Sequence, residues 1–319
     1  MRFRLAAAGA VALALAGCSP AAPAPLSSPG PTASSLPPSP TATPAASGTP
    51  QPSPPPIMIV VLENHGYGDV IGNPAAPNLN ALAAHYGLAT ASYAWSHPSL
   101  PNYLELIAGN SFGISSDCTD CSVEGTTVAD QVLSRHADWA AYEESMPSPC
   151  FKGDSYAGLY AKKHDPFMYF AHIRNSPALC NRIQPLSALW PALDAGTVPA
   201  FAFVTPNLCH DGHDCSLQQS DAWVGGFVNR IAASTWFAAG GVLIVTYDEG
   251  TSNEGCCAGA AGGHIATWVV SGHTPAGARL RTPVDHAGVM RTIELLYQVP
   301  PTAYAACACS GDLLALIGR

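Results

Sequence analysis

The sequence predicts an α/β fold of three layers, in which a mainly parallel sheet carries helices on both faces. Short apolar runs alternate with stretches of helical periodicity from residue 57 onward, and this alternation is typical of strands joined by crossover helices. Polar clusters follow three of the apolar runs, at 63–64, 210–214 and 248–249. Because ligands bind at the carboxyl ends of strands in open α/β sheets, the three clusters predict one shared site.

The elements follow from their local patterns. The run 57–62 reads IMIVVL, and apolar β-branched residues of this kind form buried strands. The stretch 78–86 places Leu79, Leu82 and Tyr86 on one helical face. A helix at 101–108 would end at Gly109, which suits a C-terminal stop. Further strands are expected at 88–95, 138–142, 200–204, 241–245 and 265–270, and further helices at 127–136, 185–195, 221–239 and 286–297, the last capped by Asp285 and His286.

Residues 1–18 have the features of a secretory signal that ends in a lipobox. Arg2 and Arg4 precede a short apolar run, which Leu-Ala-Gly-Cys at 15–18 closes, so Cys18 is the residue expected to be lipidated. The run is too short to remain as a membrane span. We therefore expect an exported protein, held at the cell surface through Cys18 or secreted after release. The alternative is an ordinary signal peptide in which Cys18 has no role.

The next segment, 19–56, contains only Pro, Ala, Ser, Thr, Gly, Leu and one Gln. Such a composition cannot bury enough apolar surface to fold, so the segment is predicted to be a disordered tether. Residues 57–319 then form one α/β domain, which is expected to act as a monomer. The net charge is −9, with only 13 Lys and Arg, which argues against a nucleic-acid partner.

The chain has 11 cysteines. Apart from Cys18 their number is even, which in an exported protein indicates disulfides. Cys118-x-x-Cys121 has the alternative interpretation of half a zinc site, although no second half with matching spacing follows. The expected pairs are Cys118 with Cys121, Cys209 with Cys215, Cys307 with Cys309, and Cys150 with Cys180.

Two of the polar clusters have the composition of a metal site. Glu63 and Asn64 follow the first strand, and Asp248 and Glu249 follow the strand at 241–245. Four oxygen donors of this kind suit Ca²⁺, Mg²⁺ or Mn²⁺ better than Zn²⁺. A divalent cation is therefore the predicted cofactor. The alternative for each pair is a solvated turn or acidic loop.

Ser99 is the candidate nucleophile. We expect it at the N-cap of the helix 101–108, where free backbone N–H groups and the helix dipole favour an anion. A serine hydroxyl needs a base or a metal for activation. No Gly-x-Ser-x-Gly pattern surrounds Ser99, which disfavours an α/β-hydrolase and favours activation by the metal. The alternative is a helix cap without catalytic function.

Histidines supply the remaining candidates. The residues at 210–214 are His210, Asp211, Gly212, His213 and Asp214. They could contact a phosphate, protonate a leaving group, or bind a second metal together with His264. For His97 and His164 a structural role is an equal alternative. The adjacent Lys162 and Lys163 are interpreted as a solvated face rather than a phosphate clamp.

Several short motifs, taken together and in order, resemble the phosphoesterase family of bacterial acid phosphatases and phospholipases C, within the alkaline phosphatase superfamily. The resemblance covers residues 57–300 and is strongest toward secreted actinobacterial acid phosphatases that act on phosphatidylinositol 3-phosphate. Its motifs are Glu63-Asn64-His65, Pro98-Ser99-Leu100-Pro101-Asn102-Tyr103, Lys163-His164-Asp165-Pro166-Phe167, Thr205-Pro206-Asn207 and Val245-Thr246-Tyr247-Asp248-Glu249.

The resemblance implies a site with one metal ion and a serine nucleophile. Ser99 would be both ligand and nucleophile, with His164 and His213 near the phosphate and Asn102 in the catalytic set. The loop with Cys256-Cys257 before Gly262-Gly263-His264 departs from the family pattern. This departure argues against a role for His264 and against phospholipase C activity. The implied metal ligands are Glu63, Asn64, Ser99, Asp248 and Glu249, and the residues around them or in an alternative metal set are His210, Asp211, His264 and His97.

The predicted function is hydrolysis of a phosphomonoester through a phosphoserine, with a phosphoinositide headgroup as one candidate substrate. Two alternatives remain open. One is a phosphodiesterase of the phospholipase C type, which would leave a phosphomonoester on its product. The other is a tethered lipoprotein that binds a ligand without catalysis.

Overall fold

The computed structural model describes residues 53–257 and 259–318. The predicted leader with Cys18, and the predicted tether up to residue 52, lie outside the described residues. Pro55 is buried, and the Pro56 carbonyl accepts a hydrogen bond from Val242 N (2.9 Å). The last residues assigned to the tether therefore already contact the domain before its first strand begins at Ile57.

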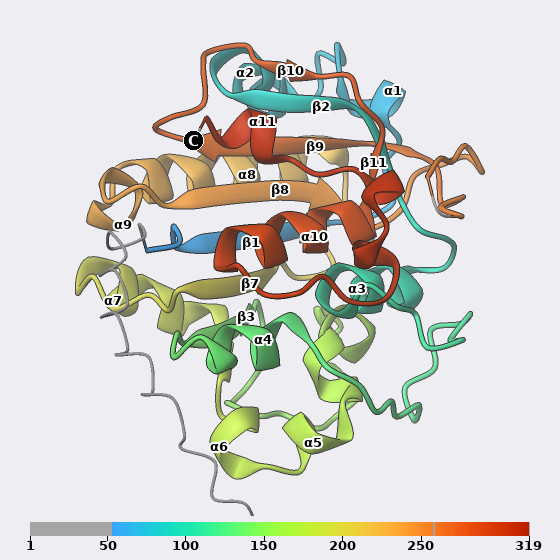
Figure 1. The fold of residues 1–319 in the computed structure, drawn as a ribbon, viewed down its shortest axis with the longest axis vertical. Helices are drawn as coiled ribbons and strands as arrows, with labels where there is room; N and C mark the ends of the chain where they lie inside the picture. Colours follow the sequence, from blue (N-terminus) through green and yellow to red (C-terminus); the bar gives the residue numbers. More distant parts are fainter. Residues whose placement is uncertain (1–52, 258, 319) are drawn as a thin grey trace, which may run out of the picture. The chain divides into compact units, whose positions relative to one another are not determined.

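The described residues build a nine-stranded sheet in the order β10-β2-β9-β8-β1-β7-β3-β6, with β11 beside β2 (Figure 1). The strands β6, β3, β7, β1 and β8 run parallel, whereas β9 is antiparallel to both β8 and β2. A separate hairpin joins β4 and β5. The strands are β1 (Ile57–Leu62), β2 (Gly87–Tyr93), β3 (Trp139–Glu143), β4 (Ser155–Tyr156), β5 (Tyr160–Ala161), β6 (Ile183–Pro185), β7 (Phe201–Thr205), β8 (Val242–Tyr247), β9 (His264–Ser271), β10 (Arg279–Leu280) and β11 (Val284–Asp285).

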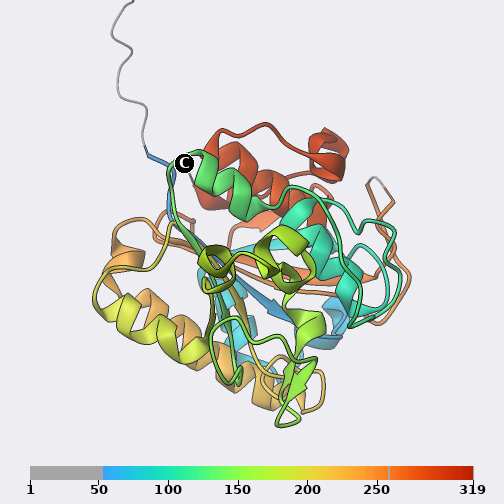
Figure 2. The ribbon, with the colours of Figure 1, turned by 90° about the horizontal axis from the view of Figure 1, so that it is seen from below.

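Helices cover both faces of this sheet, which confirms the predicted three layers (Figure 2). Side chains of β1 alternate: Ile57, Ile59 and Val61 face one apolar core, and the residues between them face the other, as the two-residue period of a strand requires. The first core packs against α3 (Ser99–Ala108), α4 (Val128–Ser134), α10 (His286–Tyr297) and α11 (Leu314–Ile317); the second packs against α2 (Pro77–His85), α7 (Leu189–Asp194), α8 (Leu217–Ala232) and α9 (Thr235–Ala238).

The predicted elements are present, with some differences in their bounds and with additional short helices. The expected helix 221–239 is two helices, because Ser234 caps a new helix by accepting a hydrogen bond from Phe237 N. The loop after Glu63 contains α1 (Tyr67–Val70), and the irregular stretch near 171–180 contains α5 (Ala171–Arg174) and α6 (Pro177–Cys180). The expected helix 185–195 begins as a 3-10 turn at Leu186–Ala188. Asp285 caps α10, as predicted, through Gly288 N (2.9 Å).

All four predicted disulfides are present, so the interpretation of Cys118-x-x-Cys121 as half a zinc site is wrong. A fifth disulfide joins the neighbouring Cys256 and Cys257. Among the described residues, no helix combines the length and the apolar character that crossing a membrane requires.

Candidate functional site

The candidate site lies where three neighbouring strands end. In the sheet β1 lies between β7 and β8, so their carboxyl ends bring together Glu63, the loop after Thr205, and Asp248. Backbone hydrogen bonds hold these ends in register, from Glu63 N to Asp211 O (2.9 Å) and from Asp248 N to Leu62 O (2.8 Å). The predicted convergence of the three polar clusters is therefore found in the structure.

Glu63 is the centre of the site and is fully buried. One carboxylate oxygen, Oε2, accepts a hydrogen bond from Ser99 Oγ (3.1 Å), and the other, Oε1, accepts one from Tyr103 Oη (2.7 Å). His164 Nε2 lies 3.1 Å from Oε1. Burial raises the pKa of Glu63 well above its ordinary value, and the nearby Asp248 and Asp211 carboxylates raise it further. The folded chain thus holds a carboxylate where its charge is poorly compensated by the protein alone.

Ser99 belongs to the first turn of α3 rather than to the position before it. The helix begins at Ser99, and Pro98 occupies the cap position, which corrects the predicted N-cap. The Ser99 side chain is 1% exposed. At the other end, Gly109 stops the helix in the left-handed conformation, with φ 61°, as predicted.

Asn102 holds the turn that carries Ser99. Its Nδ2 donates to Ser96 O (2.8 Å) and Pro98 O (3.0 Å), and its Oδ1 accepts from Ser96 N (2.9 Å). These three bonds engage both ends of the amide with backbone. Asn102, expected in the catalytic set, is therefore placed to position Ser99.

The second carboxylate of the site is Asp248, which is fully buried. Its Oδ1 accepts from Asn64 N (3.2 Å), and Asn64 has a positive φ of 59°. Burial, followed by the charge of Glu249, raises the pKa of Asp248 to about 8. Glu249 itself forms an ion pair with His97 Nδ1, so His97 holds this carboxylate in place. Asn64 borders a surface cavity of about 430 Å³ together with His65 and Thr251.

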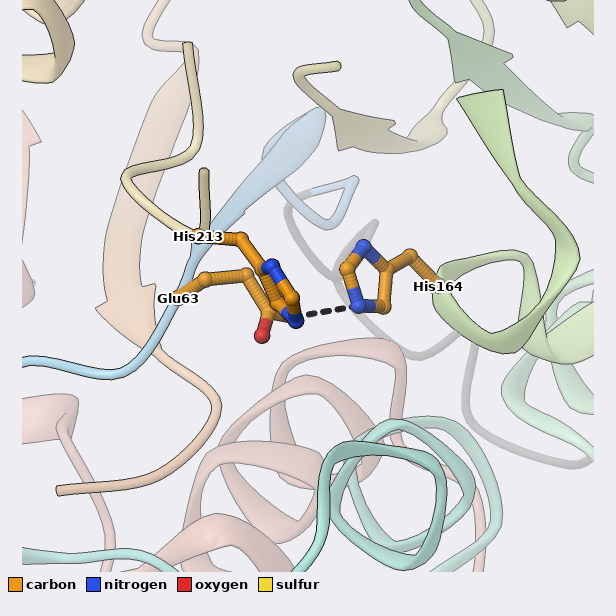
Figure 3. A group of neighbouring side chains, drawn as sticks. All are labelled: Glu63, His164 and His213. Atoms are coloured by element: carbon orange, nitrogen blue, oxygen red, sulfur yellow. Dashed lines mark ion pairs between the residues drawn. The ribbon is translucent and has the colours of Figure 1, made fainter. Parts of the chain in front are cut away.

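Two histidines complete the centre (Figure 3). Atoms of Glu63, His164 and His213 that could bind a metal all lie within 4.8 Å of one another. His164 stacks on the Tyr103 ring, with centroids 5.1 Å apart, and burial lowers its pKa well below the ordinary value, with Lys163 lowering it further. Both effects favour the neutral form of the His164 imidazole, which is the form that binds metals. His213 Nδ1 lies 2.7 Å from Asp214 Oδ1, so the opposite nitrogen faces the centre.

Lys163 and Asp117 also belong to the site, and the sequence interpretation missed both. Lys163 is only 20% exposed, which corrects its assignment to a solvated face. Its Nζ donates to Asp117 Oδ2 (2.9 Å) and lies 3.2 Å from His213 Nε2. Burial alone would lower the pKa of Lys163, but Asp117 outweighs it and the pKa is raised. The position of Lys163 directly before His164 was the available signal; Asp117 gave none.

Other predicted residues lie around this centre or outside it. Asp211 is buried beside His164, with Oδ2 3.4 Å from Nδ1. His210 turns away and contacts Glu144 Oε2 (2.8 Å). His264 stacks on Tyr67, and its Nε2 lies 3.0 Å from Thr90 O. These contacts give no support to a second metal bound by His210 and His264.

The residues at the centre fit a divalent metal ion. Asp248 Oδ2 and His164 Nε2 are buried and have no hydrogen-bond partner of good geometry among the described residues. Buried polar atoms without partners are costly unless a ligand completes them. Carboxylate oxygens beside neutral imidazole suit a divalent cation, and the histidines extend the range of fitting ions from the predicted Ca²⁺, Mg²⁺ and Mn²⁺ toward Zn²⁺.

Comparison with known proteins agrees with this geometry. A model of the Phosphoesterase family matches residues 70–300. The chain is also 32% identical, over 256 residues, to the phosphatidylinositol-3-phosphatase of Mycobacterium tuberculosis, an alignment that covers 79% of this chain and 80% of that protein. The chain belongs to the Phosphoesterase family. It is therefore a hydrolase of phosphate esters, as predicted.

More distant matches support the same family and fold. The phosphate-repressible acid phosphatase of Penicillium chrysogenum is 30% identical over 56% of this chain and 45% of its own length, so this chain spans about half of that relative. A solved structure from Vibrio parahaemolyticus, described as a protein in the alkaline phosphatase superfamily, matches with a TM-score of 0.55 at 14% identity, over 78% of this chain and 67% of that one. That likeness confirms the predicted fold class.

Proposed function

We propose that this phosphoesterase hydrolyses phosphomonoesters with Ser99 as its nucleophile. The observation that carries the proposal is the Ser99 hydroxyl, which lies in the first turn of α3 and donates to the buried Glu63 carboxylate within the cluster of candidate metal ligands. A nucleophile in contact with a potential metal ligand is the arrangement that activation by a cation requires.

The residues that would hold the cation are Glu63, Asp248 and Ser99. Asn64 and Glu249 border the same centre, and His164 lies against Glu63. A bound divalent ion supplies a lowered pKa for the serine hydroxyl and compensates the charge of the phosphoryl oxygens. We expect the bound ion to be Ca²⁺, Mg²⁺ or Mn²⁺ rather than Zn²⁺.

The chain itself supplies the remaining steps. Ser99 Oγ, whose hydroxyl proton is released to solvent, attacks phosphorus, and the bond to the leaving oxygen breaks as that oxygen takes a proton from His213. Asp214 Oδ1 accepts a hydrogen bond from the Nδ1–H of His213 and so directs Nε2 toward the centre. The N–H groups of Ser99 and Leu100, in the first turn of α3, favour the charge on the phosphoryl oxygens, although Leu100 N is bonded to Asp117 Oδ1 (3.0 Å) before substrate binds. Water then attacks the phosphoserine and regenerates Ser99.

The substrate proposal rests on the relatives. The relative of 32% identity is named a phosphatidylinositol-3-phosphatase, and others are named acid phosphatases. A phosphoinositide headgroup is therefore the first candidate. An anchor on the predicted lipidation residue Cys18 would keep the domain beside such a lipid. The acid phosphatase names also favour a monoesterase over the phosphodiesterase alternative.

The test of the function is hydrolysis of p-nitrophenyl phosphate beside bis(p-nitrophenyl) phosphate. We expect turnover of the monoester and little turnover of the diester. Preference for the diester would establish the phosphodiesterase instead. No hydrolysis of either compound by protein that still binds Mn²⁺ or Ca²⁺ would favour the lipoprotein that binds without catalysis.

The role of His213 predicts a dependence on the leaving group. In His213→Gln we expect kcat for an alkyl phosphate, which needs a proton on its leaving oxygen, to fall about a hundredfold. Hydrolysis of p-nitrophenyl phosphate should fall much less, because that leaving group departs unprotonated. The control is His85→Gln, since His85 is exposed on α2. Equal losses on both substrates would contradict proton donation by His213.

A further inference from the structure

Asp117 occupies an unusual position beside the nucleophile. Its Oδ1 accepts a hydrogen bond from Leu100 N (3.0 Å), and its Oδ2 accepts one from Lys163 Nζ (2.9 Å). Leu100 follows Ser99 directly in the first turn of α3. Lys163 lies 3.2 Å from His213 Nε2. Both partners of the carboxylate are thus neighbours of the proposed reacting groups.

These two donors are the ones that a phosphoryl group at Ser99 would need. A phosphorus atom attacked by Ser99 Oγ would present its oxygens to the next backbone N–H and to the nearest cation, as anions do at helix N-termini. The buried Nε2 of His164, without a hydrogen-bond partner of good geometry among the described residues, adds a polar group that awaits a ligand at the same centre. A carboxylate offers two oxygens to these donors in much the same way as a phosphate does.

Asp117 also lies within the electrostatic reach of the site. Burial raises the pKa of Glu249, His97 lowers it, and the Asp117 charge raises it again. The segment that carries Asp117 continues into the short loop closed by the Cys118–Cys121 disulfide, and the Asp117 side chain is 26% exposed. The carboxylate therefore sits at the rim of the site on a segment of the chain distinct from the sheet and its metal ligands.

We propose that Asp117 is an internal competitor for the phosphate position, which substrate must displace from Leu100 N and Lys163 before it can bind. This inference rests on the proposed function, because it takes Ser99 as the point to which phosphate binds. An anion can bind only in molecules whose Leu100 N and Lys163 are not bonded to Asp117. The apparent dissociation constant of the anion is therefore its intrinsic value divided by the fraction of such molecules. The same factor applies to every anion that uses these donors, whatever its own affinity.

The proposal has a signature in kinetics. In Asp117→Asn and Asp117→Ala we expect KM for p-nitrophenyl phosphate to fall about five- to tenfold while kcat changes little. The inhibition constant for inorganic phosphate should fall by the same factor. The matched control is Asp120→Asn, which removes the same charge from an exposed position of the same loop. It should leave both constants unchanged.

Two other roles of Asp117 give different results. If Asp117 positions Lys163 for the substrate, its replacement raises KM, and the proposal is wrong. If Asp117 only repels anions without competing for their donors, its replacement tightens the binding of dianionic phosphate clearly more than that of monoanionic phosphate when pH is varied across the second pKa of the anion. A common factor for both forms is expected from competition.

A direct measurement separates this inference from the proposed function. Inorganic phosphate is titrated into the purified wild-type protein and into both Asp117 variants, and binding is measured by calorimetry with and without Mn²⁺. This measurement needs no turnover. Tighter phosphate binding by the variants supports the competitor even if the wild-type protein proves inactive. Unchanged or weaker binding overturns it even if hydrolysis through Ser99 is established.

Discussion

Replacing Ser99 by alanine is expected to lower kcat for p-nitrophenyl phosphate by at least about a thousandfold. Ser99 Oγ is the buried hydroxyl that donates to Glu63 at the start of α3, and no other group at this centre can form the phosphoserine. Alanine favours a helix, and the hydroxyl makes a single hydrogen bond, so the fold should be retained. The melting temperature and circular dichroism of the variant check this point.

The intermediate gives a second measurement for the same residue. Wild-type protein quenched in acid during turnover should carry one phosphate on the peptide that contains Ser99, as mass spectrometry can show, and Ser99→Ala should carry none. Ser116→Ala is the control, because Ser116 is an exposed serine of a nearby loop. Activity near the wild-type level in Ser99→Ala would remove the serine mechanism and leave direct attack by water.

Replacing Glu63 by glutamine is expected to abolish both metal binding and turnover while making the metal-free protein more stable. The Glu63 carboxylate is fully buried, and its pKa is raised by burial and by neighbouring carboxylates. An acid whose pKa is raised in the folded state destabilises the fold as the pH rises above the pKa that the group has in the unfolded chain, about 4.3 for Glu. Glutamine keeps the shape without the charge, so the penalty at neutral pH is lost.

The measurement is the melting temperature at neutral pH, with chelator and with added Mn²⁺ or Ca²⁺. With chelator, Glu63→Gln should melt several degrees above the wild type, and the difference should shrink below about pH 4 because Glu63 is then neutral in both states. Added metal should raise the melting temperature of the wild type only. The exposed Glu124 provides the control variant Glu124→Gln. Stabilisation of Glu63→Gln by metal would show that Glu63 is not a ligand.

The regular elements were predictable because their patterns are local. The IMIVVL run of β1 and the AFAFV run of β7 predict buried strands. The helix predicted at 286–297 has the same bounds as α10. The predicted helix boundaries were wrong where a single residue sets the end of a helix. Ser234 splits a continuous amphipathic pattern by capping a second helix, and Ser99 lies inside the helix that it was expected to cap.

Convergence of the site was also predictable. Residues that follow parallel strands must meet at one edge of the sheet, so Glu63, Asp248 and the loop with Asp211 and His213 could be grouped from the sequence alone. Strand order decides how close they come. With β1 between β7 and β8, Glu63 contacts both other clusters, which no local pattern specifies.

Contacts between segments far apart in the chain required the tertiary structure. Lys163 looked like a surface cation beside Lys162 until the fold placed it against Asp117 and His213. His264 was expected to join the residues at 210–214 in binding a second metal, yet its ring stacks on Tyr67. A sequence states which side chains can ionise or bind a metal, whereas burial and long-range partners decide which of them do so. Those depend on how strands and loops are arranged around the sheet edge, and that arrangement is a property of the whole chain.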